Sequence, residues 1–71
     1  MIKLTVEFDR ELDGRHIAIV PELPGVMTCR KRKEDALSSV QVLALKVIAD
    51  RIQHSEIPSP FTGLTFEVPA L

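Results

Sequence analysis

Cysteine and histidine are scarce in this chain, and both shortages limit how the fold can be stabilised. The 71 residues contain one cysteine, Cys29, and two histidines, His16 and His54. A single cysteine cannot form a disulfide within the chain, and the two histidines lack the companion ligands of a zinc site. We therefore expect no metal and no cofactor. Oligomerisation remains as the route by which so short a domain gains stability.

A large charge of one sign and a long hydrophobic run are also missing. The net charge is -1, which gives no general reason to expect nucleic acid or an anionic membrane as a partner. The longest apolar stretch is too short to span a membrane, and the N-terminus does not read as a signal segment. Hydrophobic residues make up 45% of the chain, as in folded domains. We expect one cytoplasmic domain over residues 1–71.

What is present begins with a hairpin. Residues 2–9 alternate between apolar and polar side chains, which predicts a half-buried strand. Asp13-Gly14 supplies tight-turn chemistry, and a second strand is expected over residues 15–20. That strand is apolar on both faces, with Ala18 and Val20 on one and Ile17 and Ile19 on the other. Such a strand is covered twice, by its own fold or by a partner.

The remaining elements complete an α+β order. The segment Pro21-Glu22-Leu23-Pro24-Gly25 breaks regular structure, and a short strand is expected over residues 26–30. Residues 33–53 contain no Gly or Pro and show helical spacing. A loop over residues 55–60 and a last strand over residues 63–68 follow. The predicted fold is an antiparallel β-β-β-α-β domain.

The predicted helix carries two apolar stripes. The first should pack on the sheet and comprises Leu37, Val40, Ala44, Val47 and Ile48, flanked by Ala36 and Leu43. The second, here called the outer stripe, lies on nearly the opposite side and comprises Val42, Leu45, Ala49 and Ile52. One sheet face needs only the first stripe, so the outer stripe predicts an oligomer interface that Ile17 and Ile19 could join. The alternative is cover by the C-terminal segment, for example by Ile57, Phe61 or Leu71.

The turn Pro21-Glu22-Leu23-Pro24-Gly25 and the helix opening Glu34-Asp35-Ala36-Leu37 resemble the HicB family of antitoxins. In that family a hairpin leads into a Pro-x-Leu-Pro-Gly turn, a short strand and a helix that begins with acidic residues and Ala-Leu. The resemblance covers residues 2–68. It implies a partial ribonuclease-H-like fold without nuclease activity. The implied role, within a type II toxin–antitoxin system, is to mask the active site of a small HicA-type toxin that cleaves mRNA.

Two departures from the family pattern change what is expected. Many relatives carry a DNA-binding domain after the last strand, whereas this chain ends at Leu71, so we expect no autorepression by this chain alone. The family enters its helix through Gly-x-Thr or Gly-x-Ser, and here Arg30 and Arg32 occupy those two positions. A shortened relative of this kind can have a partner other than HicA, or none.

The run Arg30-Lys31-Arg32-Lys33 is unusual at a helix start. Cations there oppose the helix dipole, and Arg32 cannot cap the free N–H groups as Ser or Thr would. One interpretation is an anion-binding patch for RNA or an acidic partner. The other, which we prefer, is a solvated helix entrance partly neutralised by Glu34 and Asp35. A basic run without interleaved aromatic residues is a weak indication of nucleic-acid binding.

No residue pattern predicts catalysis. Glu7, Asp9 and Glu11 share one strand and its end, whereas two-metal hydrolysis needs carboxylates from several elements. Cys29 and His16 have no evident third group to orient them, and His54 is explained by a place at the helix C-terminus. Phosphate-loop, Gly-x-Ser-x-Gly and His-Glu-x-x-His motifs are absent from the sequence.

The sequence thus predicts a protein-binding domain and leaves two alternatives open. The first expectation is an antitoxin-like module that binds its partner through Pro21, Glu22, Leu23, Pro24 and Gly25, at the sheet edge around the turn that ends at Val26, and through the helix entrance. A self-associating structural module, built on the outer stripe as a homodimer or higher oligomer, is the second. Weak nucleic-acid binding through Arg30 to Lys33 is the third.

Overall fold

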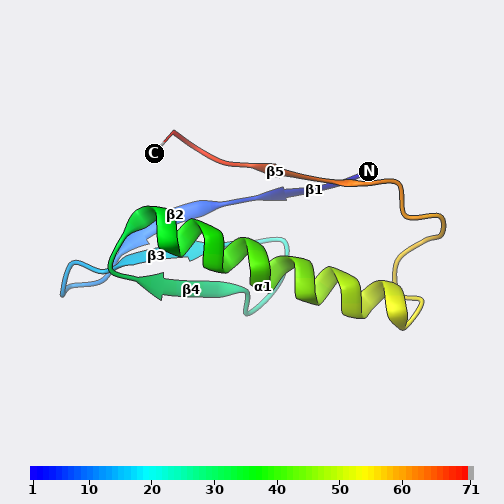
Figure 1. Ribbon diagram of the computed structural model, residues 1–71, viewed down its shortest axis with the longest axis horizontal. Coiled ribbons are helices and arrows are strands. Elements are labelled where there is room, and N and C mark those ends of the chain that lie inside the picture. The colour runs from blue at the N-terminus through cyan, green and yellow to red at the C-terminus, as the bar shows by residue number, and fades with distance from the viewer. Residues whose placement is uncertain (71) are drawn as a thin grey trace.

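The computed structural model describes residues 1–70 and contains five strands and one helix (Figure 1). Leu71 lies outside the described residues. In chain order the elements are β1 (Ile2–Thr5), β2 (Glu7–Arg10), β3 (His16–Ile19), β4 (Met27–Arg30), α1 (Lys33–Gln53) and β5 (Leu64–Glu67). The predicted α+β class and the bounds of the helix are confirmed.

The strands pair in two groups that share the N-terminal segment. β2, β3 and β4 form an antiparallel sheet in that order, and β1 pairs with β5 in parallel. β1 and β2 are separated only by Val6, whose N–H donates to the Glu67 carbonyl at 2.9 Å. The single strand predicted over residues 2–9 is therefore one extended segment that changes partner at Val6.

The prediction of a wholly antiparallel arrangement is wrong, because β5 runs parallel to β1. The cause is the number of reversals in the chain. β3 reverses the direction of β2, β4 reverses it again, and the long helix returns the chain to the end where β1 starts (Figure 1). β5 therefore begins beside β1 and runs the same way, as in a strand–helix–strand crossover.

The turns after β2 and after β3 form at the glycine, proline and aspartate residues that favour turns. In the β2–β3 turn, Gly14 has φ +92° and the Asp13 carboxylate accepts the Arg15 N–H at 3.0 Å. After β3, Pro24 and Gly25 occupy the central positions of a turn closed by the Val26 N–H, which donates to the Leu23 carbonyl at 3.0 Å. Gly25 has φ +81°, the value that a type II turn requires at its third residue.

The helix covers one face of the sheet. The Thr28 hydroxyl donates to the Ala36 carbonyl at 3.0 Å and ties β4 to the first turn of α1. Beneath the helix lies a core of apolar side chains that are almost inaccessible to solvent: Leu4, Val6, Ala18, Val20, Leu23, Val26, Ala36, Val40, Ala44 and Ile48. Leu37, Leu43 and Val47 pack at its margin, so the first stripe predicted for the helix is the packed one.

Candidate partner-binding surface

The face of the sheet turned away from α1, here called the open face, is covered by none of the described helices or strands. Thr28 contacts the helix, and Ala18 and Phe8 lie beside it in register. Side chains alternate along a strand, so the neighbouring positions Ile17, Ile19 and their partners point the other way. Neither isoleucine belongs to the core cluster under the helix.

The open face has an apolar centre and an acidic border. In one row Ile19 lies between Glu7 and Met27, and in the next Ile17 lies between Asp9 and Cys29. Met27 is 51% exposed and Ile19 is half-buried, whereas Ile17 is buried, with 9% of its surface exposed. On the same face Thr5 lies beside Glu67. An apolar centre with a polar rim is the usual anatomy of a protein–protein interface.

The turn Pro21–Gly25 borders this face at β1. The carboxylate of Glu22 accepts hydrogen bonds from the Thr5 hydroxyl and backbone N–H, and these bonds lower the pKa of Glu22 below its ordinary value. Pro21, Glu22, Pro24 and Gly25 are exposed, whereas Leu23 is buried in the core. Leu23 therefore fixes the turn to the domain, and the other four residues are the ones that a partner can reach.

The outer stripe of the helix is exposed. Val42 is 52% accessible, Leu45 48% and Ile52 40%, and Ala49 is exposed as well. Ile17 and Ile19 lie on the opposite side of the sheet, so the structure does not join them to the outer stripe. Of the residues considered as cover, Ile57 packs against the core, Phe61 lines a hollow with Ile52, and Leu71 lies outside the described residues.

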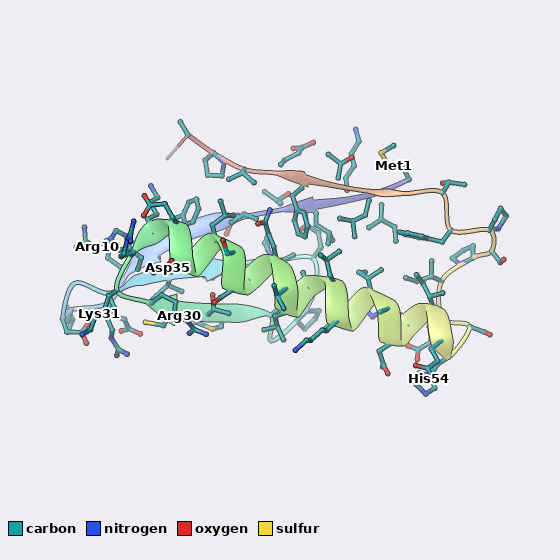
Figure 2. All side chains as sticks on the ribbon, in the orientation of Figure 1. Met1, Arg10, Arg30, Lys31, Asp35 and His54 are labelled. Atoms are coloured by element: carbon teal, nitrogen blue, oxygen red, sulfur yellow. The ribbon has the colours of Figure 1, made fainter. Side chains whose placement is uncertain are left out.

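The basic run does not converge on one point. The Arg30 side chain donates to the Cys29 carbonyl at 2.7 Å. The Arg32 Nε lies 3.6 Å from a carboxylate oxygen of Glu34. The Lys33 ammonium lies 4.7 Å from the centroid of the Phe8 ring. Figure 2 shows Arg30 and Lys31 near the hairpin end of the molecule, where Lys31 lines a hollow with Asp13 and Arg15. Arg32 makes no side-chain cap, as expected. Three of the four cations are thus engaged by different neighbours.

The candidate catalytic groups are not brought together. His16 lies in the row that faces the helix side, beside Arg10 and Arg30, whereas Cys29 lies on the open face. Within residues 1–70, His, Cys, Asp and Glu side chains form no group of three that could hold a metal ion. The His54 ring contacts the Asp50 carbonyl at 2.8 Å, and this contact and the Asp50 carboxylate raise the pKa of His54.

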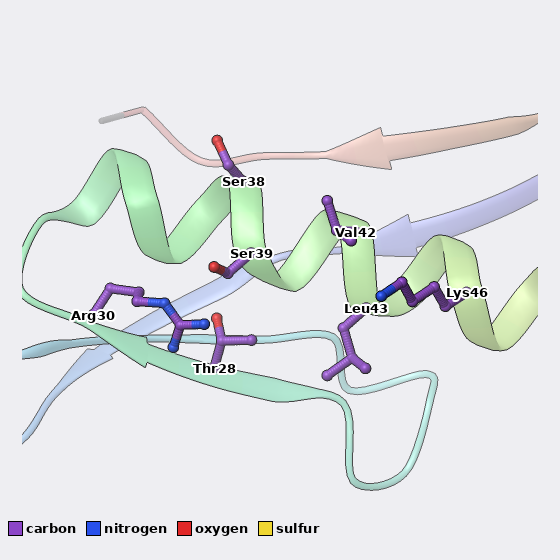
Figure 3. A pocket seen from close by; sticks show the side chains of 7 residues that line it. All are labelled: Thr28, Arg30, Ser38, Ser39, Val42, Leu43 and Lys46. Carbon is purple, nitrogen blue, oxygen red and sulfur yellow. The ribbon is translucent and has the colours of Figure 1, made fainter.

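Sequence reasoning did not identify the hollow between α1 and the outer edge of β4. It has a volume of about 430 Å³, and Figure 3 shows the side chains that line it: Thr28, Arg30, Ser38, Ser39, Val42, Leu43 and Lys46. The short side chains of Ser38 and Ser39 leave this space open. Two serines on one helical turn beside an exposed valine are the sequence signal for it.

Comparison with known proteins gives no match: no family model, no curated protein and no solved structure is similar to this chain. Among the described residues, α1 is too polar to cross a membrane.

Proposed function

We propose that this chain is a cytoplasmic, non-catalytic protein-binding domain of the antitoxin type, which blocks a small mRNA-cleaving ribonuclease by covering its active site. The observation that supports this proposal is the open face, with its apolar centre and its carboxylates. The resemblance of the Pro21–Gly25 turn and the helix opening to the HicB family supports the same function.

The charge of the open face suits such a partner. Glu7, Asp9 and Glu67 stand on strands of this face, where Lys3 is the one cation among the described strand residues, and the hydrogen-bonded Glu22 stands at its border. A ribonuclease must present positive charge to the phosphates of its RNA substrate. Carboxylates around an apolar contact therefore steer the toxin to this surface and compete with RNA for the same cations.

The direct test is co-expression with the small protein encoded beside this chain, with growth rescue and the mass of the purified complex as readouts. We expect a stable complex and rescued growth. Ile19→Asp places a charge in the apolar centre and should abolish binding. Glu7→Lys/Asp9→Lys should slow association and reduce its dependence on salt. Glu56→Lys, an exposed change beyond the helix, is the matched control and should bind as the parent chain does.

Two results would contradict the proposal. One is the absence of any complex and of growth rescue when both proteins are folded and soluble. The other is a complex whose affinity is unchanged by Ile19→Asp, since the partner would then bind elsewhere. A homogeneous homo-oligomer with no such partner would favour the self-associating module instead.

A further inference from the structure

The outer edge of β4 carries backbone groups that pair with no other described strand. β4 is the last strand in the order β2–β3–β4, and Figure 1 shows it at the border of the sheet. The Val20 N–H donates to the Val26 carbonyl at 3.0 Å. This bond shows which pairs of opposite residues between β3 and β4 are the hydrogen-bonded ones. Because hydrogen-bonded pairs alternate in an antiparallel ladder, Thr28 bonds inward, and Met27 and Cys29 direct their N–H and C=O groups outward.

This edge is complementary to itself. We propose that two copies of the chain pair antiparallel along β4, around a two-fold axis at Thr28. Met27 of each copy then lies opposite Cys29 of the other, and each of these pairs exchanges both backbone hydrogen bonds. The Cys29 carbonyl already accepts from the Arg30 side chain, and its second lone pair remains for the strand of the other copy.

The hollow beside β4 lies where the second copy would pack. Ser39, Val42 and Lys46 line it from the helix, and Thr28 lines it from the strand (Figure 3). Pairing of the two edges brings the two α1 helices side by side and antiparallel above the joined sheet. Val42, which is 52% exposed in the single chain, is then covered by the helix of the second copy.

The charges along this flank of the helix select a second copy as the occupant. Asp35, Ser39, Val42 and Lys46 follow one another at helical spacing and form one stripe, acidic at one end and basic at the other. An antiparallel neighbour with the same stripe sets Asp35 of each copy near Lys46 of the other. Within one chain the two residues are about 16 Å apart along the helix axis, well beyond the range of an ion pair.

This interface leaves the open face free. The joined sheets would present two open faces side by side, so dimerisation and partner binding use different surfaces. The dimer does not depend on the proposed antitoxin function, and either can fail without the other.

The test is the self-association constant of the full chain, measured by sedimentation equilibrium over a wide range of concentration. Asp35→Lys and Lys46→Asp should each weaken the dimer by up to about tenfold, since each places two like-charged pairs across the axis. The double variant should restore the parent affinity, because exchanged charges again attract. Glu34→Lys makes the same charge change one residue away, on another side of the helix, and should have little effect.

A backbone variant tests the strand pairing separately. Cys29→Pro removes an N–H that points outward and leaves the inward hydrogen bonds of Thr28 in place, so it should abolish dimerisation while circular dichroism shows a folded chain. A chain that stays monomeric at millimolar concentration would overturn the inference. A dimer that responds to neither charge variant and persists in folded Cys29→Pro would overturn it as well. Rescue by the double charge variant supports it even where Cys29→Pro does not fold.

Discussion

Thr5 holds the carboxylate of Glu22 with two hydrogen bonds, from its backbone N–H at 2.9 Å and from its hydroxyl at 2.6 Å. The contact joins β1 to the turn that follows β3. β1 pairs with β5 along its other edge, so on this edge a side-chain carboxylate takes the place that the carbonyl of a strand would occupy. Glu22 is thereby fixed at the border of the open face.

The Thr5–Glu22 contact predicts an acid-sensitive contribution to stability. The folded chain lowers the pKa of Glu22, so this contribution is complete above the ordinary glutamate pKa and is lost as pH falls through the lower, folded value. In Glu22→Gln, the midpoint of urea unfolding should therefore fall less between about pH 5 and pH 3 than in the parent chain. Equal pH profiles for the two chains would show that the contact does not persist in solution.

His54 at the end of α1 predicts the opposite dependence. The Asp50 carbonyl and carboxylate raise the pKa of His54, so its contribution is complete below the ordinary histidine pKa and is lost as pH rises through the raised value. NMR titration of the imidazole should give a pKa above that of an unstructured peptide. Asp50→Asn keeps the backbone carbonyl and removes the carboxylate, and it should reduce the shift without abolishing it. An unshifted pKa in the parent chain would contradict this assignment.

Two leucines provide a matched test of the core. Leu4 is 2% exposed beneath the helix, and Leu45 is 48% exposed on the outer stripe. Leu4→Ala should lower the free energy of unfolding by about 2–5 kcal/mol, a large share of the roughly 4–11 kcal/mol expected for a chain of this length. Leu45→Ala should cost less than about 1 kcal/mol at a concentration where the chain is monomeric. Similar urea midpoints for the two variants would mean that Leu4 is not in the core.

Replacement of Gly25 should destabilise the chain through its backbone conformation and not through contacts with neighbouring residues. Its φ is +81°, and a Cβ added there would meet nothing within 4 Å. Gly25→Ala should therefore destabilise the chain by about 1–2 kcal/mol through backbone strain alone. Gly25→Asn should cost less, since asparagine tolerates positive φ better than alanine does. The urea unfolding midpoints of both variants measure the difference, and an alanine variant as stable as the parent would refute the turn geometry.

Local chemistry made much of the fold predictable. The alternation of residues 2–9, the Asp13-Gly14 turn and the uninterrupted helical spacing of residues 33–53 each act over a few neighbouring residues, and the structure follows them. The parallel pairing of β1 with β5 joins opposite ends of the chain and has no local signal. The change of partner at Val6 has no local signal either. Val6 fits the same apolar–polar alternation as its neighbours, and the strand pairing changes there only because β5 ends beside it.

The candidate surfaces were predictable only in part. The outer stripe could be read from helical spacing, and its residues are exposed as expected. Ile17 and Ile19 lie on the sheet face that the helix does not cover. The spacing of apolar residues in the sequence does not say which face of the sheet the helix covers, so this position could not be predicted. The acidic border of the open face needs strand register as well, since Glu7 and Glu67 come from opposite ends of the sequence.

The change of partner at Val6 leaves β5 attached to the fold through β1. Among the described elements, β5 pairs only with β1, and its Leu64 and Phe66 pack at the margin of the core to which β1 contributes Leu4. Loss of this pairing would leave the β2–β3–β4 pairing and the contacts of α1 in place, so we expect the amides of β5 to exchange with solvent deuterium through a local opening that needs less free energy than global unfolding. Opening would leave β1 with a vacant edge that can accept the C-terminal strand of another copy, so strand exchange is a second route by which copies of this chain can associate.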